Sequence, residues 1–149
     1  MTQHITRHDP RLAAWSAFLR AHARVVRELE RELQAEQRMA LTDYDVLVQL
    51  ANAGERRLRM SELADRLLLS RSGATRLVDR LVAQGLVARV VCDVDRRGQW
   101  ASLTDAGYER LRLASPTHLR GVAEHFLDRL STDELVALER VFTRLDDDA

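Results

Sequence analysis

The chain has 149 residues, of which 46% are hydrophobic and 31% are charged, and its formal net charge at pH 7 is zero. These values are typical of one folded globular domain and exclude an intrinsically disordered chain. The single cysteine, Cys92, excludes an intramolecular disulfide and a four-cysteine zinc site. No apolar run reaches the roughly 20 residues that span a membrane, and the N-terminal segment has no signal-peptide core. We therefore expect a cytoplasmic protein with no membrane partner.

A heptad pattern predicts a long first helix that begins at Leu12. Positions 12, 15, 19, 22, 26, 29 and 33 are separated by alternating steps of three and four residues, which places them on one stripe of a helix. All are apolar except His22, for which a hydrogen-bonded residue that sets dimer register is favoured over a ligand-binding residue. Trp15, on the same stripe, is interpreted as a core residue rather than as part of a ligand site.

Cap residues predict two shorter helices in the next part of the chain. Thr42 is expected to cap a helix that stops near Gly54, with acidic residues in its first turn. A short polar stretch follows, and Ser61 is expected to cap the next helix.

A further helix is predicted after a tight turn at residues 68–69. Ser70 is its expected cap, the helix runs from Arg71 to about Gln84, and Gly85 ends it. Its inward face has apolar residues at helical spacing, namely Ala74, Leu77, Val78 and Leu81.

Two strands and two helices are predicted in the rest of the chain. Residues 87–92 and 99–103 are typical of paired strands, with residues 93–98 as the hairpin tip. Thr104 is expected to cap a helix that Pro116 kinks or restarts. A capping box, Ser131 with Glu134, marks the start of the last helix.

Two helices split by a tight turn and followed by a hairpin make a winged helix-turn-helix, whose second helix enters the major groove of DNA. Opposite its apolar stripe, the helix 71–84 carries side chains that can bond base edges and phosphates. Positive charge also collects here, because residues 54–98 contain ten arginines against six acidic residues. The candidate DNA-binding residues of this helix are Ser70, Arg71, Ser72, Thr75, Arg76 and Arg80.

The hairpin tip is the second candidate DNA contact. Arg96 and Arg97 can enter a minor groove, where the potential is most negative, and Asp95 can orient Arg97. The alternatives are a solvated arginine face on an ordinary amphipathic helix and a plain turn rich in Asp and Gly. The presence of both features in one segment favours DNA binding.

Short motifs extend across this region: residues 69–70, 74–81 and 85–87, then Asp-Arg-Arg at 95–97 and Leu-Thr-x-x-Gly at 103–107. In these motifs and in the order of its elements, the chain resembles the MarR family of bacterial transcriptional regulators. The resemblance implies a mainly α fold with a small β-hairpin wing. It also implies a homodimer with interlocking first and last helices, recognition helices in successive major grooves, and wing arginines in the flanking minor grooves.

We therefore expect a single MarR-type domain over residues 1–149. Residues 41–104 are expected to form the winged helix-turn-helix DNA-binding region, and residues 11–40 and 105–149 the helical dimerisation region. The apolar stripes of the first and last helices agree with a dimer, because one small DNA-binding module cannot cover them. A two-fold dimer presents its recognition helices about 34 Å apart, so the expected operator is an inverted repeat.

The resemblance also implies an effector cleft, because many relatives release DNA when a phenolic or other aromatic acid binds. The candidate effector-binding residues are Trp15, His22, Asp45 and His118. Cys92 is interpreted as a buried inert thiol rather than a redox switch. The five histidines lack the paired spacing of metal ligands, and no cofactor is expected.

The predicted function is that of a DNA-binding transcriptional regulator, a repressor that a small molecule releases from double-stranded DNA. The alternative is a winged-helix adaptor that binds proteins and not DNA. An enzyme is not expected, because the sequence has no glycine-rich phosphate loop, nucleophile elbow or metal-binding helix pair.

Overall fold

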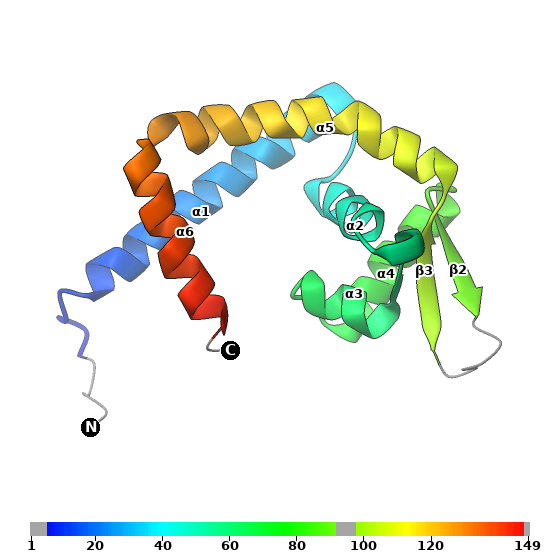
Figure 1. Ribbon diagram of the computed structural model, residues 1–149, viewed down its shortest axis with the longest axis horizontal. Helices are drawn as coiled ribbons and strands as arrows, with labels where there is room; N and C mark the ends of the chain where they lie inside the picture. Colours follow the sequence, from blue (N-terminus) through cyan, green and yellow to red (C-terminus); the bar gives the residue numbers. More distant parts are fainter. Residues whose placement is uncertain (1–5, 92–97, 148–149) are drawn as a thin grey trace. The chain divides into compact units, whose positions relative to one another are not determined.

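The computed structural model describes residues 6–91 and 98–147 (Figure 1). They form two compact units, one made of the described parts of residues 1–31 and 119–149, the other of the described parts of residues 32–118. The predicted mainly α fold with a small sheet is confirmed. The elements in chain order are α1 (Leu12–Glu32), η1 (Leu33–Gln37), α2 (Leu41–Ala51), η2 (Gly54–Arg56), β1 (Arg57–Arg59), α3 (Met60–Arg66), α4 (Arg71–Ala83), β2 (Val87–Val91), β3 (Gln99–Leu103), α5 (Asp105–His125), η3 (Leu127–Arg129) and α6 (Thr132–Asp147).

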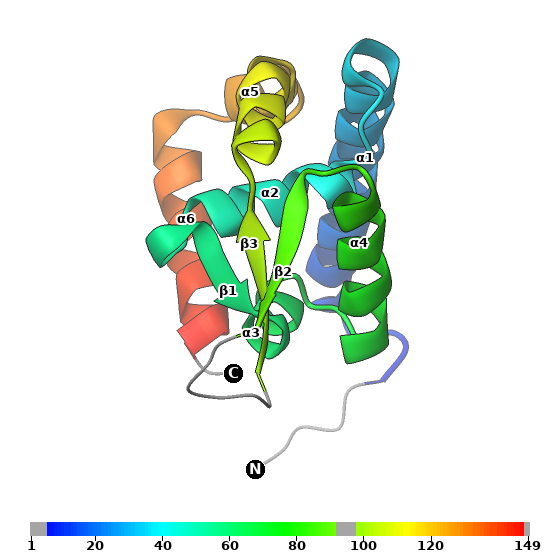
Figure 2. The ribbon, with the colours of Figure 1, turned by 90° about the vertical axis from the view of Figure 1, so that its right-hand side faces the viewer.

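The unit 32–118 is built on a three-stranded antiparallel sheet in the order β1-β3-β2 (Figure 2). β2 pairs with β3 from Val87 opposite Leu103 to Val91 opposite Gln99, and β1 pairs with the other edge of β3. Helices α2, α3 and α4 contact the sheet and one another. The largest fully buried side chains are Leu33, Val46, Leu47, Leu50, Leu63, Val78 and Leu81.

Three of the predicted caps are confirmed. The backbone N–H of Gly73 donates to Ser70 Oγ at 3.1 Å, which begins α4. The N–H of Gly107 donates to the Thr104 hydroxyl at 2.9 Å, and the capping box of Ser131 starts α6. Gly85, with a φ of 73°, follows the end of α4 as expected.

The caps predicted at Thr42 and Ser61 are wrong. α2 begins one residue earlier, at the buried Leu41, and its N-cap position is held by Ala40 without a side-chain hydrogen bond. α3 begins at the buried Met60, directly after β1. At both sites burial of an apolar first residue sets the start of the helix, and the hydroxyl residue lies inside the first turn.

Two other differences concern β1 and Pro116. β1 covers part of the stretch that the sequence predicts to be a polar linker, because its three residues become a strand only by pairing with β3. Pro116 lies inside α5, which runs through it from Asp105 to His125 without restarting.

The unit formed by residues 1–31 and 119–149 contains α1, η3, α6 and the last part of α5. Phe18 is the centre of its aromatic contacts: its ring centroid lies 5.9 Å from that of Trp15, 6.0 Å from that of His22 and 5.7 Å from that of Phe142. An apolar groove of about 730 Å³ lies between these helices. It is lined mainly by Phe18, Val26, Phe126, Leu130, Leu138 and Phe142.

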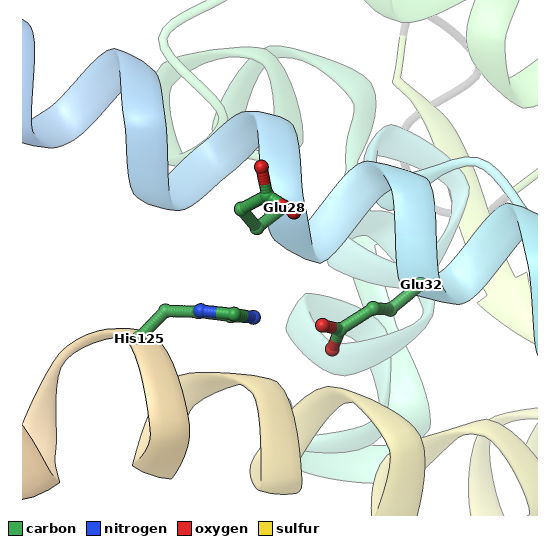
Figure 3. A group of neighbouring side chains, drawn as sticks. All are labelled: Glu28, Glu32 and His125. Atoms are coloured by element: carbon green, nitrogen blue, oxygen red, sulfur yellow. The ribbon is translucent and has the colours of Figure 1, made fainter.

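A polar pair lies at this groove. Glu28 on α1 has a carboxylate oxygen within 4.8 Å of a ring nitrogen of His125, at the end of α5 (Figure 3). The Arg31 guanidinium donates to Glu28 at 2.8 Å and holds the pKa of that carboxyl below its usual range, and the nearby His125 acts in the same direction.

Among the described residues, no helix combines the length and the apolarity that a membrane span requires.

Candidate nucleic-acid interface

The helix α4 presents one buried face and one exposed face, as its sequence predicts. Its apolar stripe packs into the core of the unit. On the opposite side Arg71, Ser72 and Arg76 are exposed, and Thr75 is half-buried. The donors that can bond base edges and phosphates are therefore on the solvent side of this helix.

The N-terminal end of α4 is shaped by two serine hydroxyls. Ser70 Oγ accepts the cap hydrogen bond from Gly73 and lies 3.2 Å from Ser72 Oγ. A Cβ on Gly73 would lie 3.1 Å from Ser70 Oγ, so the absence of a side chain at Gly73 leaves space for the Ser70 hydroxyl. Free backbone N–H groups at a helix N-terminus attract anions, and here they add to Arg71 nearby.

Arg80 has a partner that the sequence interpretation does not include. Its guanidinium pairs with the Asp43 carboxylate on α2, where Arg80 Nε donates to Asp43 Oδ1 at 3.2 Å. Asp43 is only 7% exposed, whereas half of the Arg80 side chain remains accessible. This ion pair attaches α4 to α2, so Arg80 has a positioning role in addition to the DNA contact predicted for it.

A second ion pair attaches α4 to the hairpin. Arg89 on β2 donates to Asp79 of α4 at 2.7 Å and to the side chain of Gln99 on β3 at 2.6 Å. The helical period places Asp79 on the exposed face of the helix but does not reveal this partner. The bridge links α4 to both strands of the hairpin.

The predicted wing residues Asp95, Arg96 and Arg97 lie outside the described residues, as does Cys92. The described strands confirm the hairpin that leads to them. Beside it, sequence reasoning missed three side chains that come together: Arg57 and Arg59 of β1 lie against the ring of Trp100 on β3. The alternation of the two arginines around Leu58 was the available signal, because period two is typical of a strand.

The effector candidates Asp45 and His118 belong to the unit 32–118. Asp45 is half-buried on α2. His118 packs on the buried Tyr44 with ring centroids 4.3 Å apart, and the Tyr44 hydroxyl lies 3.3 Å from Ser115 Oγ. Burial lowers the pKa of His118. Its Nδ1 is buried and has no hydrogen-bond partner within the described part of the chain.

The effector candidates Trp15 and His22 belong to the other unit. Both lie on α1 and contact Phe18. Trp15, which the sequence pattern places in a core, is 56% exposed in the single chain. His22 also lines the apolar groove.

The fold is similar to that of AbsC, a MarR family transcriptional regulator from Streptomyces coelicolor. The two chains are 32% identical with a TM-score of 0.87, and the similarity covers 98% of this chain and 97% of AbsC. The chain belongs to the MarR family of transcriptional regulators.

A family model and two further relatives support this assignment. The family model matches residues 39–98, which include α2 to β2. Sco3205, a regulator from Streptomyces coelicolor solved in complex with DNA, is 34% identical with a TM-score of 0.88, over 97% of this chain and 90% of Sco3205. The transcriptional repressor MprA from Escherichia coli (strain K12) is 33% identical over 104 residues, which are 70% of this chain. The chain spans 58% of the length of the curated relatives that it matches.

Proposed function

We propose that this MarR-family protein is a sequence-specific DNA-binding regulator that acts as a homodimer on an inverted-repeat operator. The observation that carries the proposal is the exposed face of α4. Its donors face solvent, while Asp43–Arg80 and Asp79–Arg89 hold the helix against α2 and the hairpin. A reading helix must be held rigidly, because base contacts depend on its docking geometry. The DNA complex of Sco3205 supports the same role.

The proposed DNA-binding residues are those of α4 and the wing. Arg71, Ser72, Thr75 and Arg76 face the major groove, and Ser70 adds the N-terminal end of the helix. Arg80 contributes from the flank with the accessible half of its side chain. The wing residues Asp95, Arg96 and Arg97 complete the proposed interface in a minor groove.

The homodimer is proposed from the apolar surface of the unit 1–31 and 119–149. Of the sixteen large apolar side chains that are exposed among the described residues, ten belong to this unit. Together with the groove of about 730 Å³, they form an apolar surface of the kind that marks protein–protein interfaces. We assign dimerisation to residues 11–40 and 105–149, and DNA binding to residues 41–104.

We further propose that the regulator is a repressor that an aromatic acid releases from DNA. MprA is a transcriptional repressor, which supports the direction of regulation. Trp15, His22, Asp45 and His118 are the candidate effector-binding residues. Of these, His118 has the clearest environment, because its buried ring lies on Tyr44 and leaves Nδ1 available to a polar ligand group.

The test is a titration of the protein against its own upstream intergenic DNA, with scrambled DNA of equal length, from about 50 to 200 mM salt by fluorescence anisotropy. We expect a preference for the upstream DNA and a steep salt dependence. Addition of phenolic acids should then release the DNA. Absence of binding at low salt, or equal binding to both DNAs, would contradict the proposal and favour the adaptor alternative.

Two variants separate base contacts from phosphate contacts in the same titration. Arg76→Ala should cost about 1–3 kcal/mol on the operator and much less on scrambled DNA, if Arg76 reads a base. Arg97→Ala should weaken binding to both DNAs and make the salt slope shallower. The control is Arg7→Ala, an exposed arginine outside the residues assigned to dimerisation and to DNA binding.

A further inference from the structure

The face of the sheet opposite the core carries two arginines around one tryptophan. In the β1–β3 register Arg59 lies opposite Trp100, and Arg57 lies opposite Ser102. Alternation places Leu58 and Ala101 on the other face, where both are buried. The Cζ atoms of Arg57 and Arg59 lie 5.3 and 5.2 Å from the ring centroid of Trp100.

This arrangement orients two positive charges before any ligand binds. The indole attracts both guanidinium groups through cation–π interactions, which restrict their side-chain motion and so lower the entropy cost of binding an anion. Arg57 also pairs with Glu55, whose side chain is 73% exposed. An exposed ion pair of this kind contributes little free energy, so an incoming anion can replace Glu55.

Arg59 and Trp100 lie next to the segment that joins the two strands of the hairpin. Both lie at the end of β3 where the chain arrives from the wing segment 92–97. Arg89, which reaches α4, projects with the buried Ala101 on the opposite face. Phosphate backbones line both sides of a minor groove, so a hairpin inserted there presents one face to each.

We propose that Arg57, Arg59 and Trp100 form an outer wing clamp that binds the phosphodiester backbone on the side of the minor groove away from α4. The proposal rests on the proposed function, because it requires the wing to bind a minor groove. Double-stranded DNA is the occupant by charge complementarity. The segment 54–59 contributes three arginines and one acidic residue. Arg57 and Arg59 are two residues apart on a strand, which places them about 6.7 Å apart along it, so both can contact one regularly charged backbone.

Arg56 extends this positive surface by one residue. Its Cζ lies 4.0 Å from the ring centroid of Tyr108, and its guanidinium is 3.7 Å from the exposed Asp105. The aromatic ring orients this arginine in the same way as Trp100 orients the other two. The clamp therefore continues from the edge strand β1 into η2, where Arg56 also lies on an aromatic ring.

The test compares Arg57→Ala/Arg59→Ala with the wild type on an operator duplex that has long flanks. The salt slope should become shallower by about 0.9 for each phosphate that the variant no longer neutralises, or about 1.8 per protomer, and Kd at 150 mM salt should rise at least about tenfold. The ratio of operator to scrambled affinity should stay within about twofold, because binding to phosphates carries no sequence information.

Two control variants and two further measurements distinguish the clamp from a general charge effect or from misfolding. Arg7→Ala, at an exposed arginine outside the residues assigned to dimerisation and to DNA binding, should match the wild type. Arg57→Lys/Arg59→Lys should recover most of the salt slope because it retains both charges. Shortening the duplex to remove the flank should reduce the difference between the double Ala variant and the wild type. Thermal unfolding should show equal stability for the double Ala variant and the wild type.

The outcomes separate this inference from the proposed function. Specific binding by the wild type, with unchanged slope and Kd in the double Ala variant, would overturn the clamp and leave the regulator role intact. Failure of the wild type itself to bind DNA would overturn both. A shallower salt slope for the double Ala variant on the long duplex, but not on the shortened duplex, would establish the clamp.

Discussion

Gly107 lies where α5 begins and packs directly on the chain that leads into the hairpin. A Cβ at this position would lie 2.0 Å from the backbone oxygen of Leu86 and 2.7 Å from Leu103 Cδ1. Leu86 O also accepts the backbone hydrogen bond of Thr104 at 3.2 Å. The glycine of the Leu-Thr-x-x-Gly motif therefore permits close packing of two backbones, and the motif has a steric basis.

Gly107→Ala should destabilise the fold, because the backbone of Leu86 must move to admit the methyl group. We expect a loss of about 1–3 kcal/mol in the free energy of unfolding, measured by urea denaturation at constant protein concentration. Gly54→Ala is the matched control, because a Cβ at Gly54 meets no atom within 4 Å. Equal stabilities for the two variants would contradict this steric explanation.

At the scale of elements, the position of α4 depends on side chains from three other elements. α2 contributes Asp43, β2 contributes Arg89 and β3 contributes Gln99. These contacts lie beside the apolar face of the helix and resist its rotation about its own axis. The direction in which Arg76 and Thr75 project is therefore set by groups that never touch DNA in the proposed complex.

Breaking the Asp43–Arg80 pair should cost stability, because Asp43 is buried and would be left without its charged donor. We expect Arg80→Ala to lower the free energy of unfolding by about 1–3 kcal/mol. A double-mutant cycle with Asp43→Asn should reveal coupling between the two residues. The matched control is the exposed pair Glu62–Arg66 on α3, whose coupling should be below about 0.5 kcal/mol.

A positioning role for Asp43 also predicts an effect on DNA binding. Asp43→Asn should lower operator affinity because α4 is held less firmly. It leaves every proposed DNA-binding residue in place, so the salt slope should not change. Additive stabilities, or a changed slope in Asp43→Asn, would argue against a positioning role for Asp43.

At the scale of the whole molecule, the exposed apolar residues of the unit 1–31 and 119–149 are the basis of the proposed homodimer. Phe142 is 42% exposed in the single chain, contacts Phe18 and lines the apolar groove. Exposed apolar surface of this kind is stabilised by burial against a second copy. The proposed two-fold operator requires the same association.

Phe142→Glu should convert a dimer into a monomer, because burial of a carboxylate in an apolar interface is unfavourable. Light scattering should show the mass falling from twice 17.0 kDa to 17.0 kDa, with a loss of operator affinity. Arg140→Glu, on an exposed position of the same helix, should remain dimeric. A monomeric wild type, or a dimeric Phe142→Glu, would contradict the assigned interface.

The sequence by itself determined the order of α1 to α6 and of the β2–β3 hairpin, the apolar face of α4 and the helix ends at Ser70, Gly85, Thr104 and Ser131. Each of these depends on hydrogen bonds or periodicity within a few residues, which a local pattern records. The proposed base-reading residues could be predicted from the sequence for the same reason, because the helical period places them opposite the buried stripe.

Only the tertiary structure decided what holds that face in place. Asp43 and Arg80 are 37 residues apart along the chain, and β1 becomes a strand only through its pairing with β3. The predicted caps at Thr42 and Ser61 are wrong because burial of Leu41 and Met60 outweighs the local cap. Interactions between distant segments depend on packing of the whole unit, and a local pattern such as the alternation around Leu58 does not specify the partner.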